Sequence, residues 1–494
     1  MRRGRAALVV ALSAAGCAAP REQIVEDRFD VSESSSAPAV TDVADLGGGD
    51  VPLQGLLHTE TSDGFAVVGE TLWIHGNAFG RQPAVTVGGR PAAVLARTRD
   101  GGILVRVPPL TAPGARDVVV SNEAGRGARA INVRRLAGVL DADAGEVAWT
   151  EVGANGPIAA GTLRATGTHF LALSADGRAA YLVDGSRSLV EIVDVAANGG
   201  PKVVGELDLG PDPVVAVAAA ARAWTLAVVR ARDVALVDLS SALRPARGPT
   251  RPLPVEVREA GVAAADLSPD GKRLAVASET GNRVVLLDLG VPAAAVVASL
   301  DVLPDVREGV LADVTFSPTG DTLWIVAGDT PRSRASGPQP TQVIAARVEA
   351  GEGGAPTLRL ARTVTVADGA APERIAAGRT IPLASGSAIR LPPERASVFV
   401  SGRSRASATS GAVFRVGAED AATTMLAEPG RFGQADLTPD GRWLLAPLVA
   451  SDGSLRLYAT PNDARPGTPK SIPLLAAPRA GAEARRLPAL RVQP

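Results

Sequence analysis

The chain is poor in several residue types that point to particular chemistries. It has one cysteine, Cys17, so no disulfide can form within the chain. It has three histidines, and only 3% of its 494 residues are aromatic. Its 51 Lys and Arg residues face 52 Asp and Glu residues, a net charge of −1, whereas a nucleic-acid-binding protein normally has a strongly basic domain. These shortages argue against a disulfide-stabilised fold and against a nucleic-acid partner.

Long apolar runs are also scarce. A basic start, Met1-Arg-Arg-Gly-Arg5, precedes the apolar segment Ala6-Ala-Leu-Val-Val-Ala-Leu-Ser-Ala-Ala15. A helix needs about 20 apolar residues to cross a bilayer core of about 30 Å, so this segment predicts a cleaved export signal. The small residues before Cys17 resemble the lipobox of bacterial lipoproteins, which implies cleavage before Cys17 and its acylation. Ala14 stands where that family prefers Leu, and a plain secretory signal with an incidental cysteine is the alternative.

The lipobox resemblance implies a signal peptide over residues 1–17 and attachment to a membrane through an N-terminal lipid anchor. Ala18 rather than Asp follows the cysteine, which implies the outer membrane. Residues 18–50 are acidic and rich in Ser and Gly, with little apolar matter to bury. They predict a disordered tether between the anchor and the folded part.

Residues 51–135 predict an immunoglobulin-like β-sandwich, because six or seven short alternating segments are separated by Gly-, Pro- and Asn-containing turns. The landmarks Ile74-His-Gly-Asn-Ala-Phe-Gly80, Val85-Thr-Val-Gly-Gly89 and Val118-Val-Val-Ser-Asn122 stand in an order that resembles the IPT/TIG domain. The resemblance implies an Ig-like fold with no catalytic residue of its own. In exported bacterial proteins such domains act mostly as spacers or interaction modules.

A five-residue phrase recurs through residues 136–494, and each copy precedes an apolar run. The copies are Leu173-Ser-Ala-Asp-Gly177, Leu267-Ser-Pro-Asp-Gly271, Phe316-Ser-Pro-Thr-Gly320 and Leu437-Thr-Pro-Asp-Gly441. Pro, Asp and Gly supply turn chemistry, so the phrase predicts a hairpin between two strands of a four-stranded blade. The fold class is therefore all-β, an Ig-like sandwich followed by a β-propeller.

The spacing of the phrase predicts the number of blades. Ser268 and Ser317 are 49 residues apart, and Ser174 and Ser268 are 94 apart, which is two blade lengths. Degenerate copies at residues 219–223 and 391–395 fill the gaps. The two ends of this region leave room for two more blades closed across the termini, so seven blades are favoured, with six as the alternative.

The blade phrase and the strands that follow it resemble the YVTN/lactonase-like seven-bladed propellers. Some relatives in that group open sugar lactones, whereas many others only bind. Catalysis would need a compact group of carboxylates, histidines or a metal at the channel mouth, and His58, His75 and His169 have no mutual spacing that suggests a metal site. No cofactor and no metal are predicted. Asp266 and Asp436, just before the turns, are candidates either for a cation in the channel or for turn stabilisation.

Arginines in the loops between the second and third strands of the blades form the candidate binding face. All of these loops emerge on one face of a propeller, and an arginine offers a fork of donors to carboxylates and phosphates. The candidates are Arg187, Arg230, Arg232, Arg283, Arg332, Arg334, Arg403 and Arg405. The alternative is that arginine is simply the common solubilising residue of this chain.

Together these patterns predict an exported lipoprotein of the bacterial cell envelope with a non-catalytic binding or scaffolding role. The predicted partner is an envelope protein, an acidic glycan or a phosphate-bearing molecule that engages the arginine-bearing face. A lactonase-like or other hydrolytic propeller is the first alternative, and a structural spacer is the second.

Overall fold

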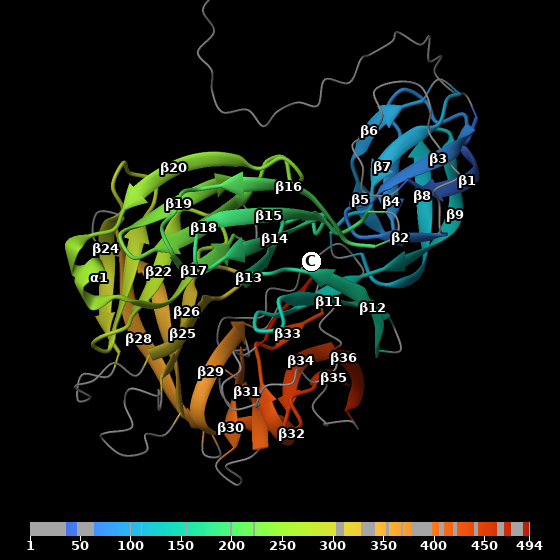
Figure 1. The fold of residues 1–494 in the computed structure, drawn as a ribbon. Helices are drawn as coiled ribbons and strands as arrows, with labels where there is room; N and C mark the ends of the chain where they lie inside the picture. Colours follow the sequence, from blue (N-terminus) through green and yellow to red (C-terminus); the bar gives the residue numbers. More distant parts are fainter. Residues whose placement is uncertain are drawn as a thin grey trace, which may run out of the picture.

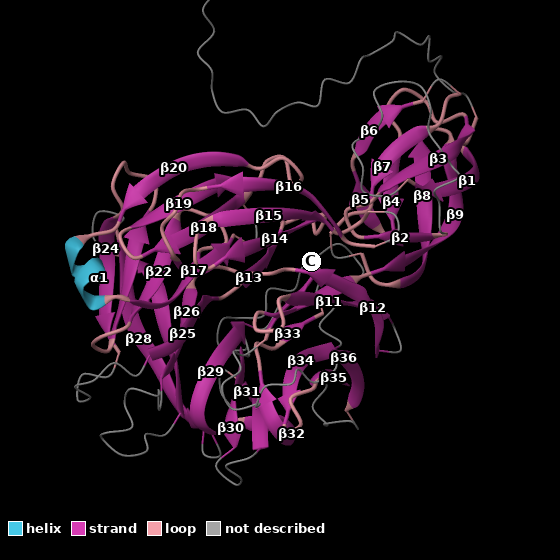
Figure 2. Ribbon diagram, viewed as in Figure 1, coloured by secondary structure: helices cyan, strands magenta, loops and turns pink. Residues whose placement is uncertain are grey.

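The computed structural model consists of β-strands in two domains, with a single described helix, α1 (Val255–Ala260), at the left edge of Figure 2. The smaller domain lies at the upper right of Figure 1 and the larger one at the left and below. The structure describes residues 36–46 and 64–493, except for residues 99, 110, 154–155, 198–199, 221–222, 303–310, 328–340, 352–354, 367–368, 378–397, 405–409, 418–421, 439–442, 462–468 and 476–487. Cys17 and His58 lie outside these residues.

The smaller domain is a sandwich of two sheets, as predicted for an Ig-like fold. One sheet has the order β1 (Ala39–Asp45), β3 (Thr71–Asn77), β7 (Ile103–Arg106), β6 (Val94–Arg97). The other has the order β2 (Phe65–Val67), β9 (Gly125–Arg134), β8 (Gly114–Asn122), β4 (Ala84–Val87), β5 (Arg90–Ala92). Alternate residues point inward, so Ile74 and Val105 of one sheet pack against Val118 and Val120 of the other, all fully buried.

Strand β1 corrects the predicted tether, which ran to residue 50. Residues 39–45 pair antiparallel with β3, from Ala39 opposite Asn77 to Asp45 opposite Leu72. Ala44 is buried, and Val40 and Val43 pack against the sandwich core. The strand is short and carries two Asp residues, so its composition resembles that of the preceding linker. Its pairing with a strand about 30 residues later in the chain makes it part of the sandwich.

The larger domain is a β-propeller of seven four-stranded blades, of which blades 6 and 7 are joined into one eight-stranded sheet because residues 430–432 pair with residues 448–450. The first strands of blades 2 to 6 contact one another in turn and are innermost. Blade 2 has β13 (Thr168–Leu173), β14 (Ala179–Asp184), β15 (Leu189–Asp194) and β16 (Lys202–Asp208). Blade 3 has β17 (Val214–Ala219), β18 (Thr225–Arg230), β19 (Asp233–Asp238) and β20 (Ala246–Pro252). Blade 4 has β21 (Val262–Leu267), β22 (Arg273–Ser278), β23 (Arg283–Asp288) and β24 (Ala295–Asp301). Blade 5 has β25 (Leu311–Phe316), β26 (Thr322–Ala327), β27 (Thr341–Ala350) and β28 (Pro356–Val366). Blade 6 has β29 (Gly369–Ala377), β30 (Val398–Ser404), β31 (Ser410–Val416) and β32 (Thr423–Phe432). Blade 7 has β33 (Asp436–Leu437), β34 (Trp443–Ala450), β35 (Leu455–Pro461) and β36 (Lys470–Leu475).

Blade 1 is assembled from both ends of the propeller region, as the spacing predicts. Its sheet has the order β12 (Gly156–Arg164), β11 (Glu146–Gly153), β10 (Leu136–Asp141), β37 (Ala489–Val492). The innermost strand therefore comes from the C-terminal end of the chain, which Figure 1 places beside β11 and β13. It pairs antiparallel with β10, from Ala137 opposite Val492 to Leu140 opposite Ala489. This pairing closes the ring and supplies the seventh blade.

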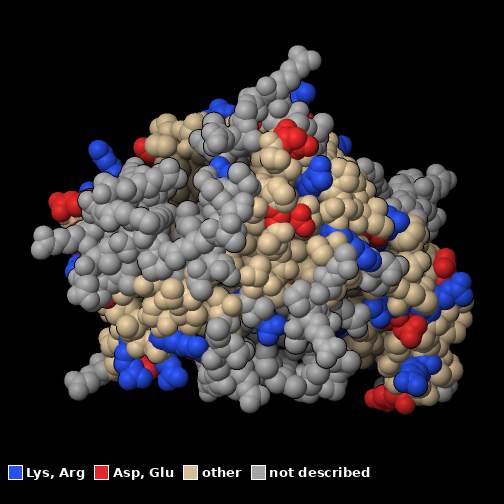
Figure 3. All heavy atoms as spheres, turned by 90° about the horizontal axis from the view of Figure 1, so that it is seen from below, with Lys and Arg blue, Asp and Glu red and all other residues tan. Residues whose placement is uncertain are grey.

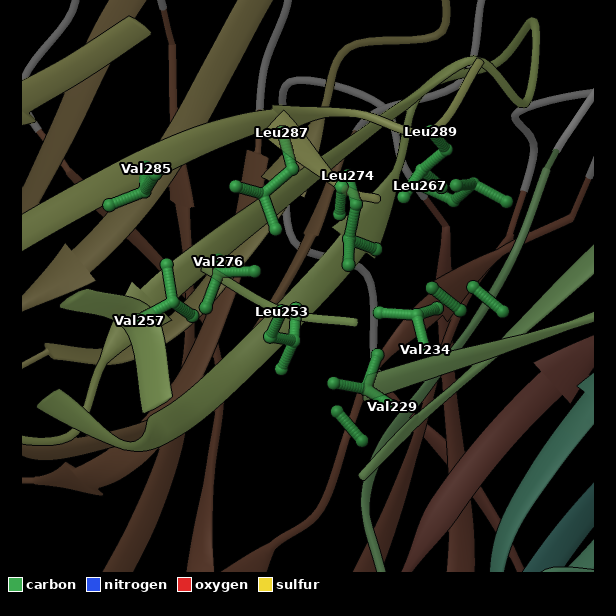
Figure 4. Close-up of a cluster of buried hydrophobic side chains, with 14 of the residues drawn as sticks. Val229, Val234, Leu253, Val257, Leu267, Leu274, Val276, Val285, Leu287 and Leu289 are labelled. Carbon is green, nitrogen blue, oxygen red and sulfur yellow. The ribbon is translucent and has the colours of Figure 1, made fainter. Parts of the chain in front are cut away.

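The described buried apolar residues of the propeller form seven clusters, one at each interface between neighbouring blades. Strand β22 shows how one strand serves two of them. Leu274 and Val276 pack toward blade 3, as Figure 4 shows together with Leu287 and Leu289, whereas Ala275 and Ala277 pack toward blade 5. Because side chains alternate along a strand, both faces of β22 are buried and its sequence is apolar throughout. The many alanines of this chain thus include interface residues that allow sheets to approach closely.

The sandwich is fixed to the propeller by a buried hydrogen-bond network around Gln493, which is fully buried. The main chain of Leu136 donates to Gln493 Oε1 (2.7 Å) and its carbonyl accepts from the Gln493 amide (3.0 Å). Gln493 Nε2 donates to the carbonyl of Val68 in the sandwich (3.3 Å) and to that of Gly177 in blade 2 (2.7 Å). One side chain therefore ties the sandwich, blade 1 and blade 2 together.

Close packing and ion pairs surround this network. Gly69 has a φ of 86°, and a Cβ there would lie 2.9 Å from the Cα of Arg178, so only glycine fits this contact. Arg106 of the sandwich lies 3.9 Å from the carboxylate of Asp176 in blade 2. Arg134 Nε lies 3.2 Å from the carboxylate of Glu151 in blade 1. The two domains therefore share a packed interface rather than a free linker.

Candidate functional site

The recurring phrase forms the turn between the first and second strands, the A–B turn. In blade 2, Ser174 Oγ donates to Asp176 Oδ1 (2.6 Å) and accepts from the Ala179 amide (2.9 Å). In blade 4, Ser268 Oγ makes the equivalent bonds to Asp270 (2.6 Å) and from the Arg273 amide (2.9 Å). The same donor and acceptor set recurs because the hairpin recurs, so the phrase is structural. The degenerate copy at residues 391–395 lies outside the described residues.

Asp266 and Asp436 occupy the same place in their blades and link neighbouring blades. Asp266 Oδ1 accepts from the Leu267 amide (2.9 Å), and its Oδ2 accepts from the Phe316 amide (2.8 Å) and from Thr315 Oγ1 (3.0 Å) of blade 5. Asp436 Oδ2 accepts in the same way from the Val492 amide of blade 1 (3.1 Å). The sequence suggested either a cation site or turn stabilisation for these two residues. The geometry favours a structural role, in which each carboxylate accepts hydrogen bonds from the next blade.

Burial raises the pKa of Asp266 to about 6, although its bonds from Phe316, Thr315 and Leu267 act in the opposite direction. The neighbouring carboxylate of Asp313 adds a smaller upward contribution to the same pKa. Asp266 as a whole residue is only partly buried. Its carboxylate, however, is directed into the junction of two blades, where it is shielded from water. The pKa of Asp266 is therefore raised to about 6 at the position where it links the two blades.

The described candidate arginines are mostly engaged by acids of their own blade. Arg187, with its side chain 64% exposed, lies 3.1 Å from Asp184 Oδ2. Burial would raise the pKa of Asp184, but hydrogen bonds from Ser186 and Arg187 outweigh it and lower the pKa. Arg283 Nε donates to Asp301 Oδ1 (2.7 Å), and this hydrogen bond lowers the pKa of Asp301. These loops present ion pairs rather than isolated positive charges.

Arg230 does not lie on the surface that the sequence predicts. Its side chain is 6% exposed, at the end of β18. The guanidinium donates to the Leu209 carbonyl (3.1 Å) and to Asp233, and lies 3.8 Å from Asp212 Oδ2. It is held inward because three acceptors surround it, so it stabilises the blade 3 turn region. Arg232, two residues further on, is exposed.

The remaining candidates are only partly described. Arg403 lies within β30, opposite Gly411 of β31, so the loop that follows is shorter than the predicted residues 402–410. The side chain of Arg403, and all of Arg332, Arg334 and Arg405, lie outside the described residues. On the side shown in Figure 3, blue and red side chains are interspersed among uncharged ones wherever residues are described.

A pocket of about 270 Å³ lies between helix α1 and blade 4. The helix connects the fourth strand of blade 3 to the first strand of blade 4, and was not predicted. Its Val257 is buried against Val276 and Leu253 (Figure 4). The Thr280 amide and hydroxyl both donate to the Ala260 carbonyl (2.9 Å each), which fixes the helix to the turn between β22 and β23. Pro254 followed by Val255-Glu-Val-Arg-Glu-Ala260 was the available signal for a helix start.

The lining of this pocket combines an apolar floor with a polar rim. Its apolar residues are Val257, Ala260, Val276, Val285 and Val296. Its charged residues are Glu256, Arg283 and Asp301, so Arg283 is a predicted candidate that the structure places at a concave site. Ser278, Thr280, Asn282 and Ser299 complete the polar part of the lining.

Two of the three histidines are described, and they lie in different domains. His75 Nδ1 is 3.7 Å from Asp100 Oδ2 in the sandwich. His169 Nδ1 accepts from the Gly185 amide (2.9 Å) in blade 2. Within the described ranges, no group of three or more His, Cys, Asp or Glu side chains is arranged to hold a metal. Nor does that part of the chain contain a helix of the length and apolarity needed to cross a membrane.

Comparison with known proteins identifies the class of the smaller domain. Residues 60–132 match the family model of the IPT/TIG domain. A search of the curated proteins gave no match. The chain is thus an all-β protein with an IPT/TIG domain and seven four-stranded sheets that resemble propeller blades.

Several solved structures resemble the chain at low sequence identity. A protein from Lactobacillus plantarum is 17% identical with a TM-score of 0.48, over 73% of this chain and 100% of that one. A putative 6-phosphogluconolactonase from Bacteroides fragilis is 13% identical with a TM-score of 0.47, over 72% and 98%. The β-propeller domain of Cps50 (Swd1) from Myceliophteria thermophila is 14% identical with a TM-score of 0.41, over 62% and 91%. The assignment of a propeller to this chain rests on its own seven sheets.

Proposed function

We propose that this protein is a non-catalytic binding and scaffolding lipoprotein of the bacterial cell envelope, anchored through Cys17. In this proposal the sandwich and the propeller form one rigid body held away from the membrane. The turns between the second and third strands of the blades, the B–C turns, engage an acidic partner. That partner is an envelope protein, an acidic glycan or a phosphate-bearing molecule.

The buried network around Gln493 is the observation that carries this proposal. A flexible linker would leave the two domains free to reorient, whereas Gln493 bonds to both and Gly69 packs against Arg178. A fixed orientation suits a protein that presents two surfaces to its partners at once. The sandwich also covers the A–B turn of blade 2. The B–C turn of that blade is therefore the end left for a partner.

The carboxylates at repeated positions support a non-catalytic role. Asp266 and Asp436 each accept from the main chain of the next blade, so they serve the ring itself. Asp184 and Asp301 are engaged by Arg187 and Arg283. The acidic-partner part of the proposal depends chiefly on Arg332, Arg334, Arg403 and Arg405, because the described B–C arginines are largely neutralised.

The partner proposal is tested with the full-length protein in detergent, using lipopolysaccharide and an acidic polysaccharide as probes. Replacing Arg332, Arg334, Arg403 and Arg405 by Ser should reduce binding at least tenfold, because charge-assisted hydrogen bonds are lost. Arg126→Ser/Arg129→Ser is the charge control, since both residues are exposed on β9 of the sandwich. Equal binding by the quadruple variant and wild type contradicts the acidic partner. Hydrolysis of a sugar lactone that a propeller substitution abolishes contradicts the non-catalytic role.

The anchor is tested separately by mass spectrometry of the mature N-terminus. The expected species begins at an acylated Cys17 and partitions into the outer-membrane fraction. Cys17→Ala should abolish acylation and release the protein from membranes. A mature wild-type chain that starts at another residue and carries no lipid would show a plain secretory signal instead.

A further inference from the structure

The pocket between α1 and blade 4 has the composition of a binding site for a small ligand. Its volume of about 270 Å³ is slightly below the range of about 300–1,000 Å³ typical of ligand pockets, so it suits a ligand of few carbon atoms. Val257 and Val276 are buried in its floor, and Val296 on β24 is 37% exposed at its edge. Apolar ligand atoms placed there would chiefly remove the exposed surface of Val296 from water, because Val257 and Val276 are only 2% and 1% exposed.

The charges around the pocket favour a cation. Glu256 and Asp301 supply two carboxylates, and Arg283 supplies one positive charge. Arg283 directs Nε to Asp301 Oδ1 (2.7 Å) and Nη2 to Asp301 Oδ2 (3.4 Å), so these two groups neutralise each other. Glu256, exposed on α1, is left as the excess charge. An anionic ligand would have to compete with Asp301 for Arg283 and would lie near Glu256 as well.

Two hydroxyl groups of the lining already donate to the protein. Thr280 Oγ1 donates to the Ala260 carbonyl (2.9 Å), and Ser278 Oγ lies 2.8 Å from the Arg283 carbonyl and 3.1 Å from the Gly281 carbonyl. These bonds hold the turn and the helix in place, so the pocket is preformed. They also occupy two of the hydroxyl donors that an anion could use, which agrees with the preference set by Glu256.

From this geometry we propose that the pocket binds a small aliphatic ammonium ion, with its carbon chain against Val257, Val276 and Val296 and its nitrogen at Glu256. A free alkylamine and the lysine side chain of a peptide present this same group. The acidic partner proposed above depends chiefly on arginines of blades 5 and 6 rather than on this pocket. Each proposal can therefore fail without the other.

The binding test uses full-length protein with valine methyl groups labelled for NMR, titrated with n-pentylamine, pentan-1-ol and pentanoate. Pentylamine should bind at least threefold more tightly than pentanol, and pentanoate most weakly. Raising the salt concentration should weaken pentylamine but not pentanol, because only the ammonium ion interacts with a charge. Nα-acetyl-lysine N-methylamide forms the second arm. Tighter binding than that of pentylamine assigns the site to a peptide, and weaker binding assigns it to a free amine.

Matched variants locate the site. Glu256→Gln should raise the dissociation constant of pentylamine about fivefold, the effect of an exposed ion pair, and leave that of pentanol unchanged. Glu259→Gln is the control on the same helix, because Glu259 is exposed and does not line the pocket. Val296→Ser should weaken both ligands, whereas Val204→Ser, on the outer strand of blade 2, should weaken neither.

Folding of each variant is checked by its thermal midpoint, which should equal that of wild type for these exposed positions. Equal affinities for pentylamine and pentanol would overturn the proposal. So would binding of pentanoate as tight as that of pentylamine, or equal effects of Glu256→Gln and Glu259→Gln.

Discussion

The two ends of the blades differ in how their turns are used. The A–B turns of blades 2 and 4 share one pattern, in which Ser174 and Ser268 each donate to an aspartate two residues later (2.6 Å in both). The B–C turns share no such pattern and hold their charges in different ways, with Arg230 buried and Arg187 exposed. Repetition therefore marks the residues that build the ring, and variation marks the end where binding is proposed.

The A–B turns also differ from one another according to what covers them. Asp176 is buried at the sandwich, 3.9 Å from Arg106, whereas Asp270 is exposed. Gly177 accepts a bond from Gln493. The same local hydrogen bonds thus belong to an interdomain contact in blade 2 and to a surface hairpin in blade 4. The neighbouring domain, rather than the phrase, decides the role of the turn.

Among these tests, Gln493→Ala should cause the largest loss of stability. It removes one acceptor and one donor group from a fully buried network, leaving the Leu136 amide and the Val68 and Gly177 carbonyls without this partner. The expected loss is about 3 kcal/mol, because buried polar groups without partners cost about 1–3 kcal/mol each. Urea unfolding measures it, and small-angle scattering should show the sandwich released from the propeller. A variant as stable and as compact as wild type would contradict the role given to Gln493.

Arg230→Ser compared with Arg187→Ser separates buried from exposed arginines at the B–C end. Removing Arg230 should cost about 2 kcal/mol, since Asp233 loses its ion-pair partner beside a buried position. Removing the exposed Arg187 should change stability by less than about 0.5 kcal/mol. The two unfolding midpoints are compared in urea. Equal effects would show that burial does not distinguish these two residues.

The pH dependence of stability tests the link between blades 4 and 5. With its pKa raised to about 6, Asp266 binds a proton more tightly in the folded than in the unfolded chain. The stabilisation that comes from this tighter proton binding is therefore present at low pH and is lost as the pH rises from about 4 through 6. We expect the free energy of unfolding to fall by about 1–2 kcal/mol over that window from this residue. Asp266→Asn should remove this part of the pH profile, and an unchanged profile would contradict it.

Asp176→Ala and Asp270→Ala should show the smallest difference in the free energy of unfolding. Both lose the bond from the turn serine, worth about 1 kcal/mol. Asp176→Ala also loses the contact to Arg106 at a buried position and should cost about 1 kcal/mol more than Asp270→Ala. Paired urea denaturation curves measure this. A greater loss for Asp270→Ala would mean that the sandwich does not depend on the blade 2 turn.

The propeller was predictable because its determinants are local and repeated. Ser174, Ser268 and Ser317 mark the hairpins in the sequence, and their spacing indicates seven blades and closure across the termini. Strand β1 was missed because residues 39–45 resemble a linker until they pair with β3. Helix α1 was missed because it is only six residues long and depends on contacts to blades 3 and 4.

The residues that join separate parts of the fold were not predictable in their roles. Gln493 bonds to groups 316, 357 and 425 residues away, and no local pattern distinguishes it from other glutamines. Asp266 precedes a turn, but its partners Thr315 and Phe316 lie in the next blade. The burial of Arg230 likewise depends on Leu209 and Asp212, which come from the preceding connection. Such roles follow from the three-dimensional arrangement of distant segments.

Strand β37 has a consequence for biosynthesis. Because Ala489–Val492 form the innermost strand of blade 1, the ring cannot close until the last residues of the propeller have left the ribosome. Until then β10 has an edge with free main-chain donors and acceptors, and such edges tend to pair with other chains. The same delay keeps the ring of the nascent chain open until residues 489–492 have been made. The chain thus completes its circular fold only after this strand has been synthesised.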